Sequence, residues 1–284
     1  MSKKKKEKKK KEKKSGISFG SIFFSIIMII GIGLMLYPSI TNLVNEGHQT
    51  VAIADYDKVT ESLSEKEKEK IWNDALEYNQ LLSSNNAMHL NKTNEAAYQK
   101  TLNITGTGIM GYIKIPKCNI ELPIYHGTSK EILQVGVGHL EGTSLPVGGK
   151  GTHCAVSGHT GLPSSKMFNN ITELKEGDLF MIKTLGKTLT YKVDNIKVVL
   201  PNDAKSITRV PGKDYCTLIT CTPYGVNSHR LLVRGHRTKN IYPEPNVSKV
   251  DKIAIMMILI GIVMLVSWFW SGIKKKRKRK NMLE

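Results

Sequence analysis

Two apolar segments without a charged side chain, one near each end of the chain, constrain the fold more than any other feature. The first extends from Ser15 to Asn45 and the second from Ile253 to Ile273. A helix crosses a bilayer with about 20 apolar residues, and helix is the expected form because lipid offers no partners for backbone polar groups. We therefore predict transmembrane helices at 17–43 and 253–273.

Each segment has one alternative interpretation. A cleaved signal peptide is the alternative for the first, but no small-x-small cleavage motif follows it, so a retained anchor is favoured. A buried core helix is the alternative for the second. The seven consecutive basic residues of Lys274–Lys280 directly follow that segment and argue against burial.

Basic tails lie outside both apolar segments. Lys3–Lys14 holds ten lysines and two glutamates, so that this block and Lys274–Lys280 account for most of the net charge of +18. Lysine and arginine remain on the cytoplasmic side of a membrane. The tails 1–16 and 274–284 are therefore predicted to be cytoplasmic, and the region between the two helices to lie outside the plasma membrane. Charge concentrated in terminal blocks, rather than in a patch with aromatic residues, argues against a nucleic-acid partner.

The exterior region divides into a helical part at 44–103, a strand-rich part at 104–240 and a linker at 241–252. A capping-box pattern at Ser64–Glu67 precedes apolar residues at helical spacing. The strand-rich part has short apolar runs broken by glycine and proline, which predicts a mainly β fold, a closed barrel or a sandwich. The eight predicted strands are Gly111–Ile115, Ile120–Tyr125, His153–Ser157, Leu179–Thr184, Thr188–Val193, Asn195–Leu200, Cys216–Cys221 and Arg230–Gly235.

Four cysteines occur, at positions 118, 154, 216 and 221, without a zinc-ligand spacing. Cys216 and Cys221 are five residues apart on one predicted strand, so their side chains point to opposite faces of the strand. Their Cα atoms would be about 16 Å apart, too far for a disulfide between them. A Cys118–Cys154 disulfide remains open, because an exterior location permits disulfides. No metal site is predicted.

The connection Thr222–His229 joins the last two predicted strands and indicates a hairpin. If they pair, Cys221 lies beside Arg230, where a guanidinium favours the thiolate and can donate to an oxyanion. The alternative for Cys221 is a small buried side chain that fills space. A cysteine nucleophile needs a proton partner, usually histidine. His159, in a glycine-flanked loop after an apolar strand, is one candidate; His126, His139 and His229 are others.

Several motifs together resemble a known family. SGHTG at 157–161 and TLITC at 217–221, with an arginine nine residues after the cysteine, resemble the sortases of Gram-positive bacteria. GYIKIP, LPIYHGTS, GVGHLEGTSLPVGG and TLITCTPYGVNSHRLLVRGHR resemble the class C, pilus-assembling branch. The resemblance implies an eight-stranded sortase-type β-barrel with N-terminal helices, no cofactor, and a catalytic triad of His159, Cys221 and Arg230. It further implies substrate binding by Thr220 and Thr222, on either side of the cysteine.

The resemblance also implies a reaction. Cys221 would attack the Thr–Gly carbonyl of an LPxTG-like sorting signal and form a thioacyl intermediate. His159 would protonate the departing amine, Arg230 would hold the substrate, and a pilin lysine would complete the transfer. The partners would be pilin subunits and other surface proteins with sorting signals. Two alternatives remain: a housekeeping sortase that attaches proteins to cell-wall peptide, and a non-catalytic adhesion domain on a sortase-like barrel.

One region departs from the class C pattern. These enzymes usually carry a lid anchored by an Asp-Pro-aromatic triplet, whereas residues 83–105 contain neither proline nor aspartate. The departure predicts a more open site.

Overall fold

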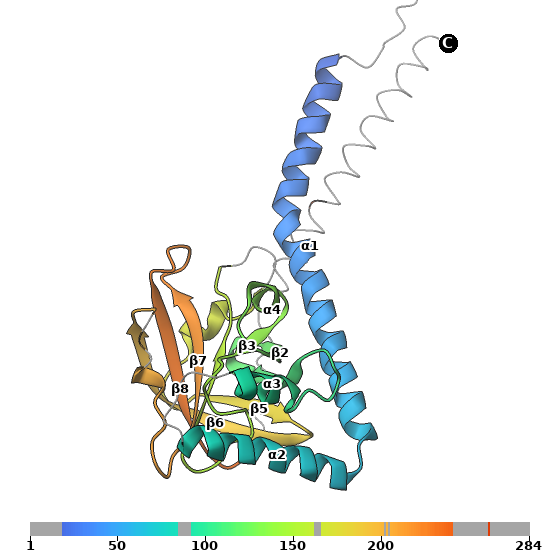
Figure 1. The fold of residues 1–284 in the computed structure, drawn as a ribbon. Coiled ribbons are helices and arrows are strands. Elements are labelled where there is room, and N and C mark those ends of the chain that lie inside the picture. The colour runs from blue at the N-terminus through green and yellow to red at the C-terminus, as the bar shows by residue number, and fades with distance from the viewer. Residues whose placement is uncertain are drawn as a thin grey trace, which may run out of the picture.

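Eight strands form a closed barrel, and helices from the N-terminal part of the chain pack against it (Figure 1). The computed structural model describes residues 19–84, 92–161, 166–201, 203, 205–240 and 261. Both predicted cytoplasmic tails, the linker 241–252 and, apart from residue 261, the predicted helix 253–273 lie outside the described residues. Around the barrel the strand order is β1-β2-β3-β4-β7-β8-β6-β5. The strands are β1 (Ile109–Ile115), β2 (Ile120–His126), β3 (Val137–His139), β4 (Thr152–Ser157), β5 (Leu179–Thr184), β6 (Lys187–Val199), β7 (Asp214–Thr222) and β8 (His229–Arg237).

The eight-stranded barrel confirms the predicted fold, but two strand assignments were wrong. The runs predicted as separate strands on either side of Asp194 form the single strand β6, with a register shift between Val193 and Asn195 where it pairs with β8. A bulge lets a strand continue past one unpaired residue. Strand β3 was missed because its three residues are too few to show alternation.

The helices are α1 (Phe19–Ser62), α2 (Glu65–Ser84), α3 (Lys92–Lys100) and α4 (Lys130–Val135), with short 3₁₀ turns at Pro116–Cys118, Asn169–Glu173 and Lys205–Ile207. Helix α2 begins at the predicted capping box: the Glu67 carboxylate accepts from the Ser64 backbone N–H at 2.8 Å. Ala75 and Leu82 of α2 are buried against the main barrel core. The amphipathic pattern of this segment is therefore confirmed. Residues 83–105, where the lid triplet of class C sortases is absent, are described only in part, since residues 85–91 lie outside the description, so the more open site stays a prediction.

Helix α1 extends well beyond the barrel (Figure 1). Its C-terminal part packs on β1 through Ile53 and Tyr56, which are buried with Ile109 and Tyr112. The Tyr56 hydroxyl donates to the Met110 carbonyl at 3.0 Å and accepts from the Leu185 N–H at 3.0 Å. These contacts fix the helix along one side of the domain.

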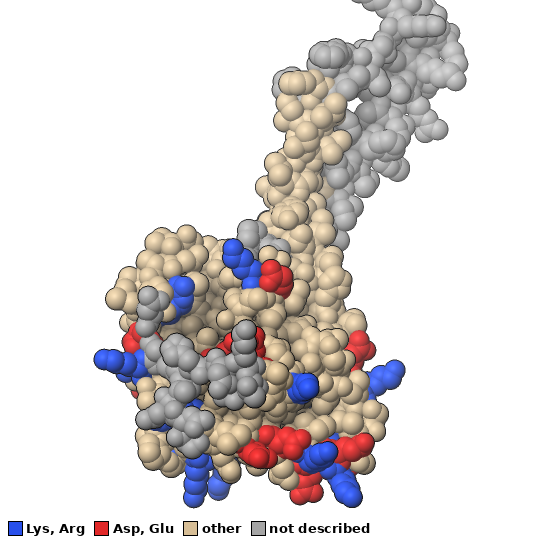
Figure 2. All heavy atoms as spheres, in the orientation of Figure 1, with Lys and Arg blue, Asp and Glu red and all other residues tan. Residues whose placement is uncertain are grey.

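The N-terminal part of α1 has the length and composition of a membrane-spanning helix. Within the described residues, Ser25–Ser62 is the one helix that is long and apolar enough. Its large apolar side chains from Phe23 to Val44 are mostly exposed. Figure 2 shows the projecting stem in the colour of uncharged residues, whereas acidic and basic side chains are scattered over the visible face of the domain. An uncharged, exposed apolar stem fits the predicted anchor at 17–43.

Candidate active site

Strands β7 and β8 form the predicted hairpin, and Cys221 lies directly opposite Arg230 in their register. Cys221 is half-buried, whereas Cys216, five residues earlier, is fully buried. All four cysteines are free thiols. The Cys118–Cys154 disulfide that the sequence left open is therefore not formed.

The alternation of β7 divides its side chains between two cores. Cys216 and Leu218 belong to the main barrel core, whereas Ile219 belongs to a second cluster with Ala155, Ile207 and Leu232. Residues two apart on a strand share a face, so Cys221 lies on the side of Ile219, and Arg230 on the side of Leu232. The cysteine and the arginine therefore face the outside of the barrel, above a small apolar floor.

Strand β4 brings His159 to the same end of the sheet. It pairs in parallel with β7, with Ser157 opposite Ile219, and the Gly158 N–H donates to the Ile219 carbonyl at 3.0 Å. His159 follows Ser157 by two residues, and Cys221 follows Ile219 by two residues, so both lie just beyond this pair. The parallel pairing thus places the histidine loop beside the end of β7.

Burial determines the charge state of His159. The side chain is half-buried, and this desolvation lowers the pKa of the imidazole below its usual 6.5. The imidazole is therefore mainly neutral at pH 7. Within the part of the chain that the structure describes, it forms neither a hydrogen bond nor an ion pair, so the backbone of its loop determines where it points.

Thr220 differs from its predicted role in substrate binding. Its side chain is only 1% exposed, and its hydroxyl donates to the Gly158 carbonyl at 2.7 Å and contacts the Thr160 hydroxyl. A buried hydroxyl with two protein partners is not available to a substrate. Alternation along β7 explains this result, because Thr220 shares the inner face with Cys216. Thr222, at the end of the strand, is half-buried and remains open to the surface.

Arg230 has donors available for a substrate. Its Nη1 donates to the carbonyl oxygens of Asn227 and His229 at 3.1 and 3.0 Å, which fixes the guanidinium against its own turn. Among the described residues it forms no ion pair with a carboxylate. Its remaining N–H groups can therefore bind a carbonyl or an oxyanion beside Cys221.

The other two arginines of the hairpin, Arg234 and Arg237, bond to neighbouring parts of the barrel. Arg234 forms an ion pair with Asp194 at 2.9 Å and lies over the Tyr215 ring at 4.2 Å. Arg237 donates to the Thr190 carbonyl at 3.1 Å. Both are structural, which separates them from Arg230.

The other candidate histidines are occupied elsewhere. His126 and His139 are buried, and both pack against the Tyr98 ring. His229 is next to the Ser228 hydroxyl at 2.9 Å, on the opposite strand face from Arg230. Among the described residues, no three histidine, cysteine, aspartate or glutamate side chains come together in a way that could hold a metal ion.

The buried imidazole of His153 makes the stability of the folded protein depend on pH. Its Nδ1 lies 3.0 Å from the Thr208 carbonyl, and its Nε2 lies 2.7 Å from the Thr217 hydroxyl. Burial lowers the pKa of the imidazole below 6.5. Below about pH 6.5 the folded protein therefore binds fewer protons than the unfolded chain. The contribution of His153 to the free energy of unfolding is fully present above about pH 6.5 and is lost as the pH falls through the pKa of His153 in the folded protein.

We expect the thermal midpoint to fall between pH 7.5 and pH 5, and to fall less in His153→Gln. Burial lowers the pKa of His126 and His159 in the same direction, so part of the fall persists in the variant. Thermal unfolding followed by circular dichroism at both pH values measures this difference. Equal falls in the two proteins would contradict it.

Comparison with known proteins agrees with this architecture. The sortase domain family matches residues 113–238. Sortase D of Bacillus subtilis is 29% identical over 150 residues, which cover 52% of this chain and 73% of that protein. The crystal structure of sortase C1 from Streptococcus agalactiae is similar at 50% identity and a TM-score of 0.65, covering 67% of this chain and 99% of that one. The structure of Clostridium perfringens sortase C with the C-terminal cell wall sorting motif is similar at 43% identity and a TM-score of 0.60, covering 67% and 100%.

A half-buried thiol at a barrel end, opposite an arginine and beside a histidine loop, is the arrangement expected of a cysteine-dependent acyl-transfer enzyme. The chain belongs to the sortase family of cysteine transpeptidases. Its similar solved structures include class C sortases. The alternative of a non-catalytic adhesion domain is therefore set aside.

Proposed function

We propose that this protein is a membrane-anchored, pilus-assembling sortase that cleaves an LPxTG-like sorting signal between threonine and glycine and joins the threonine to a pilin lysine. The direct pairing of Cys221 with Arg230, at the end of β7 where the His159 loop lies, carries the proposal. Class C relatives at 39–50% identity over most of the barrel domain support the pilus branch. The uncharged N-terminal part of α1 supports the anchor.

The first half-reaction is cleavage of the sorting signal. The Cys221 thiolate attacks the threonine carbonyl carbon, and a C–S bond forms while the carbonyl oxygen takes up negative charge. The Arg230 guanidinium donates to that oxygen. As the C–N bond breaks, the imidazolium form of His159 gives its proton to the glycine nitrogen, which leaves as an amine. The product is a thioester between the threonine and Cys221.

The second half-reaction is transfer to an amine. The neutral imidazole of His159 takes a proton from the incoming lysine, whose nitrogen attacks the thioester carbonyl. The C–S bond breaks and the Cys221 thiolate returns, leaving an isopeptide bond between threonine and lysine. Burial keeps His159 mainly neutral at pH 7, which suits this step. Water in place of lysine would give unproductive hydrolysis.

The apolar part of the signal would lie on the outer face of the barrel. The buried cluster of Ala155, Ile207, Ile219 and Leu232 lies on the same side as Cys221, and the partly buried Leu140 and Val199 pack against it. Such an apolar cluster suits the leucine and proline of an LPxTG-like peptide. We propose contact with the substrate for Thr222 and a positioning role for Thr220.

A reconstitution experiment tests the pilus assignment. Purified full-length protein in detergent is incubated with a pilin that carries a sorting signal and with the same pilin whose surface lysines are replaced by arginine. We expect a ladder of covalent oligomers on denaturing gels with the first pilin and none with the second, because arginine is not a usable nucleophile at neutral pH.

The housekeeping alternative predicts a different product. Such an enzyme would leave both pilins monomeric and attach them to an added cell-wall peptide amine. That outcome would overturn the pilus assignment while leaving the sortase chemistry intact.

A further inference from the structure

The membrane helix α1 contacts the loop that carries His159. Its buried or half-buried positions on the domain side recur at helical spacing: Asn42, Asn45, Gln49, Ile53, Tyr56 and Thr60. Ile53 and Tyr56, in the C-terminal part of this stripe, fix α1 to β1, as described above. Asn42 and Gln49, in its N-terminal part, contact residues 166–167, which belong to the connection that follows β4.

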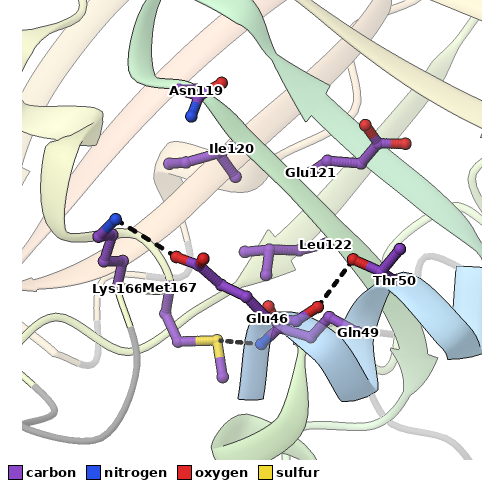
Figure 3. A pocket seen from close by; sticks show the side chains of 9 residues that line it. All are labelled: Glu46, Gln49, Thr50, Asn119, Ile120, Glu121, Leu122, Lys166 and Met167. Atoms are coloured by element: carbon purple, nitrogen blue, oxygen red, sulfur yellow. Dashed lines mark hydrogen bonds and ion pairs between the residues drawn. The ribbon is translucent and has the colours of Figure 1, made fainter. Parts of the chain in front are cut away.

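Several polar contacts join the helix to this loop (Figure 3). The Asn42 side-chain oxygen accepts from the Lys166 backbone N–H at 2.9 Å. The Lys166 ammonium lies 3.3 Å from the Glu46 carboxylate. The Gln49 amide donates to the Val135 carbonyl at 3.2 Å and lies 3.6 Å from the Met167 sulfur. Gln49 is 6% and Met167 is 2% exposed, so the contact between these two side chains is shielded from water, whereas Val135 is an exposed residue of α4.

The contacted residues are connected to His159 itself. The Phe168 N–H donates to the His159 carbonyl at 3.0 Å, and the Gly161 N–H donates to the Asn169 side chain at 2.7 Å. Phe168 is fully buried against Gly158, where an added Cβ would lie 2.7 Å from the ring. Both ends of the loop are therefore bonded to each other, and a shift of Met167 and Phe168 shifts the backbone of His159.

The contact between α1 and the loop is not a closely packed one. A hollow of about 220 Å³ lies beside these contacts and is lined by residues of α1, by the start of β2 and by Lys166 and Met167 (Figure 3). Beside this open space, the hydrogen bonds of Asn42 and Gln49 are the described polar links between α1 and residues 166–167, together with the ion pair of Lys166 and Glu46. These hydrogen bonds favour one loop position over another.

We propose that Asn42 and Gln49 of the membrane helix are positioning residues for His159. The imidazole has no hydrogen-bond partner of its own among the described residues, so its placement depends on the loop, and the loop depends on α1. Asn42 lies in the last turn of the predicted anchor 17–43. The membrane anchor then contributes directly to the geometry of the active site, and does more than hold the enzyme at the membrane. This inference rests on the proposed role of His159.

The test uses the full-length chain in nanodiscs with a fluorogenic sorting peptide and an amine acceptor. Asn42→Leu removes the acceptor at similar size, and Asn42→Asp keeps it. We expect Asn42→Leu to lower kcat by about 10-fold, because a small misplacement of a catalytic group is costly, with KM within about twofold. Asn42→Asp loses the hydrogen bond that the Asn42 amide donates to the Glu46 carboxylate at 2.8 Å, but keeps the acceptor for the Lys166 N–H. It should retain most of the parent kcat, since the Lys166 ammonium offsets the added charge beside Glu46.

A second variant and a control make the outcome decisive. Gln49→Met, which cannot donate, should also lower kcat without changing KM. Asp55→Ala, at an exposed position of the same helix, should match the parent. A kcat for Asn42→Leu and Gln49→Met within twofold of the parent overturns the inference, and so does an equal loss in Asn42→Asp. Failure of the proposed function would look different: the parent itself would not cleave the peptide.

Discussion

Replacing Cys221 with alanine is expected to lower kcat for cleavage of a sorting peptide by at least about 10⁴-fold, because no other group can form the thioester. Peptide cleavage measured by chromatography gives the rate. Cys221 is half-buried at the end of β7, so its loss should change the unfolding free energy by no more than about 0.5 kcal/mol. A folded but inactive variant is therefore the expected result.

Cys216→Ala is the matched control for this substitution. It removes the same atom from the same strand, but from the fully buried face that belongs to the barrel core. We expect peptide cleavage within a few-fold of the parent and a loss of about 1–2 kcal/mol in unfolding free energy. The reverse pattern, with activity retained by Cys221→Ala and lost by Cys216→Ala, would contradict the assignment of the nucleophile.

Arg230→Ala is expected to lower kcat/KM by about 10²–10³-fold, the usual effect of removing a donor to a developing oxyanion. The guanidinium lies opposite Cys221 and bonds only to its own turn among the described residues. Little packing depends on it, so the thermal midpoint should change by no more than a few degrees. Arg230→Lys should recover only part of the activity, because an ammonium lacks the fork geometry of arginine.

Arg234→Ala tests whether any arginine on this strand face is needed for catalysis or only Arg230. Arg234 shares a face with Arg230 but is held by Asp194 and by the Tyr215 ring. We expect this variant to lose stability, by about 1–2 kcal/mol, and to keep most of its kcat/KM. A large loss of activity in Arg234→Ala with little loss in Arg230→Ala would show that the two roles had been exchanged.

Patterns over a few neighbouring residues predicted most of the strands and the start of α2. Alternation predicted most of the strands, and the capping box predicted the start of α2. The hairpin register that pairs Cys221 with Arg230 followed from the length of the connection Thr222–His229. Strand β3 was missed because a three-residue strand pairs through distant neighbours, and β6 was split because a bulge interrupts its alternation.

Other features of the site depend on distant residues. The burial of Thr220 could have been predicted, since alternation places it on the face of Cys216. Spacing alone left four candidate histidines, and His159 was predicted from the family resemblance. What places its loop beside Cys221 is the parallel pairing of β4 with β7, which lie about sixty residues apart in the sequence. The contact of Asn42 with Lys166 joins residues 124 positions apart, and no local pattern marks it.

Mass spectrometry of the trapped acyl-enzyme tests the central claim most directly. The parent protein is mixed with a sorting peptide without an amine acceptor, quenched in acid and digested with trypsin. Both Cys216 and Cys221 lie in the tryptic peptide 214–230, so fragmentation must locate the adduct. We predict the N-terminal half of the sorting peptide, ending at threonine, on the Cys221 sulfur. An adduct on Cys216 or on another residue, or peptide cleavage without any adduct on the protein, would contradict the account.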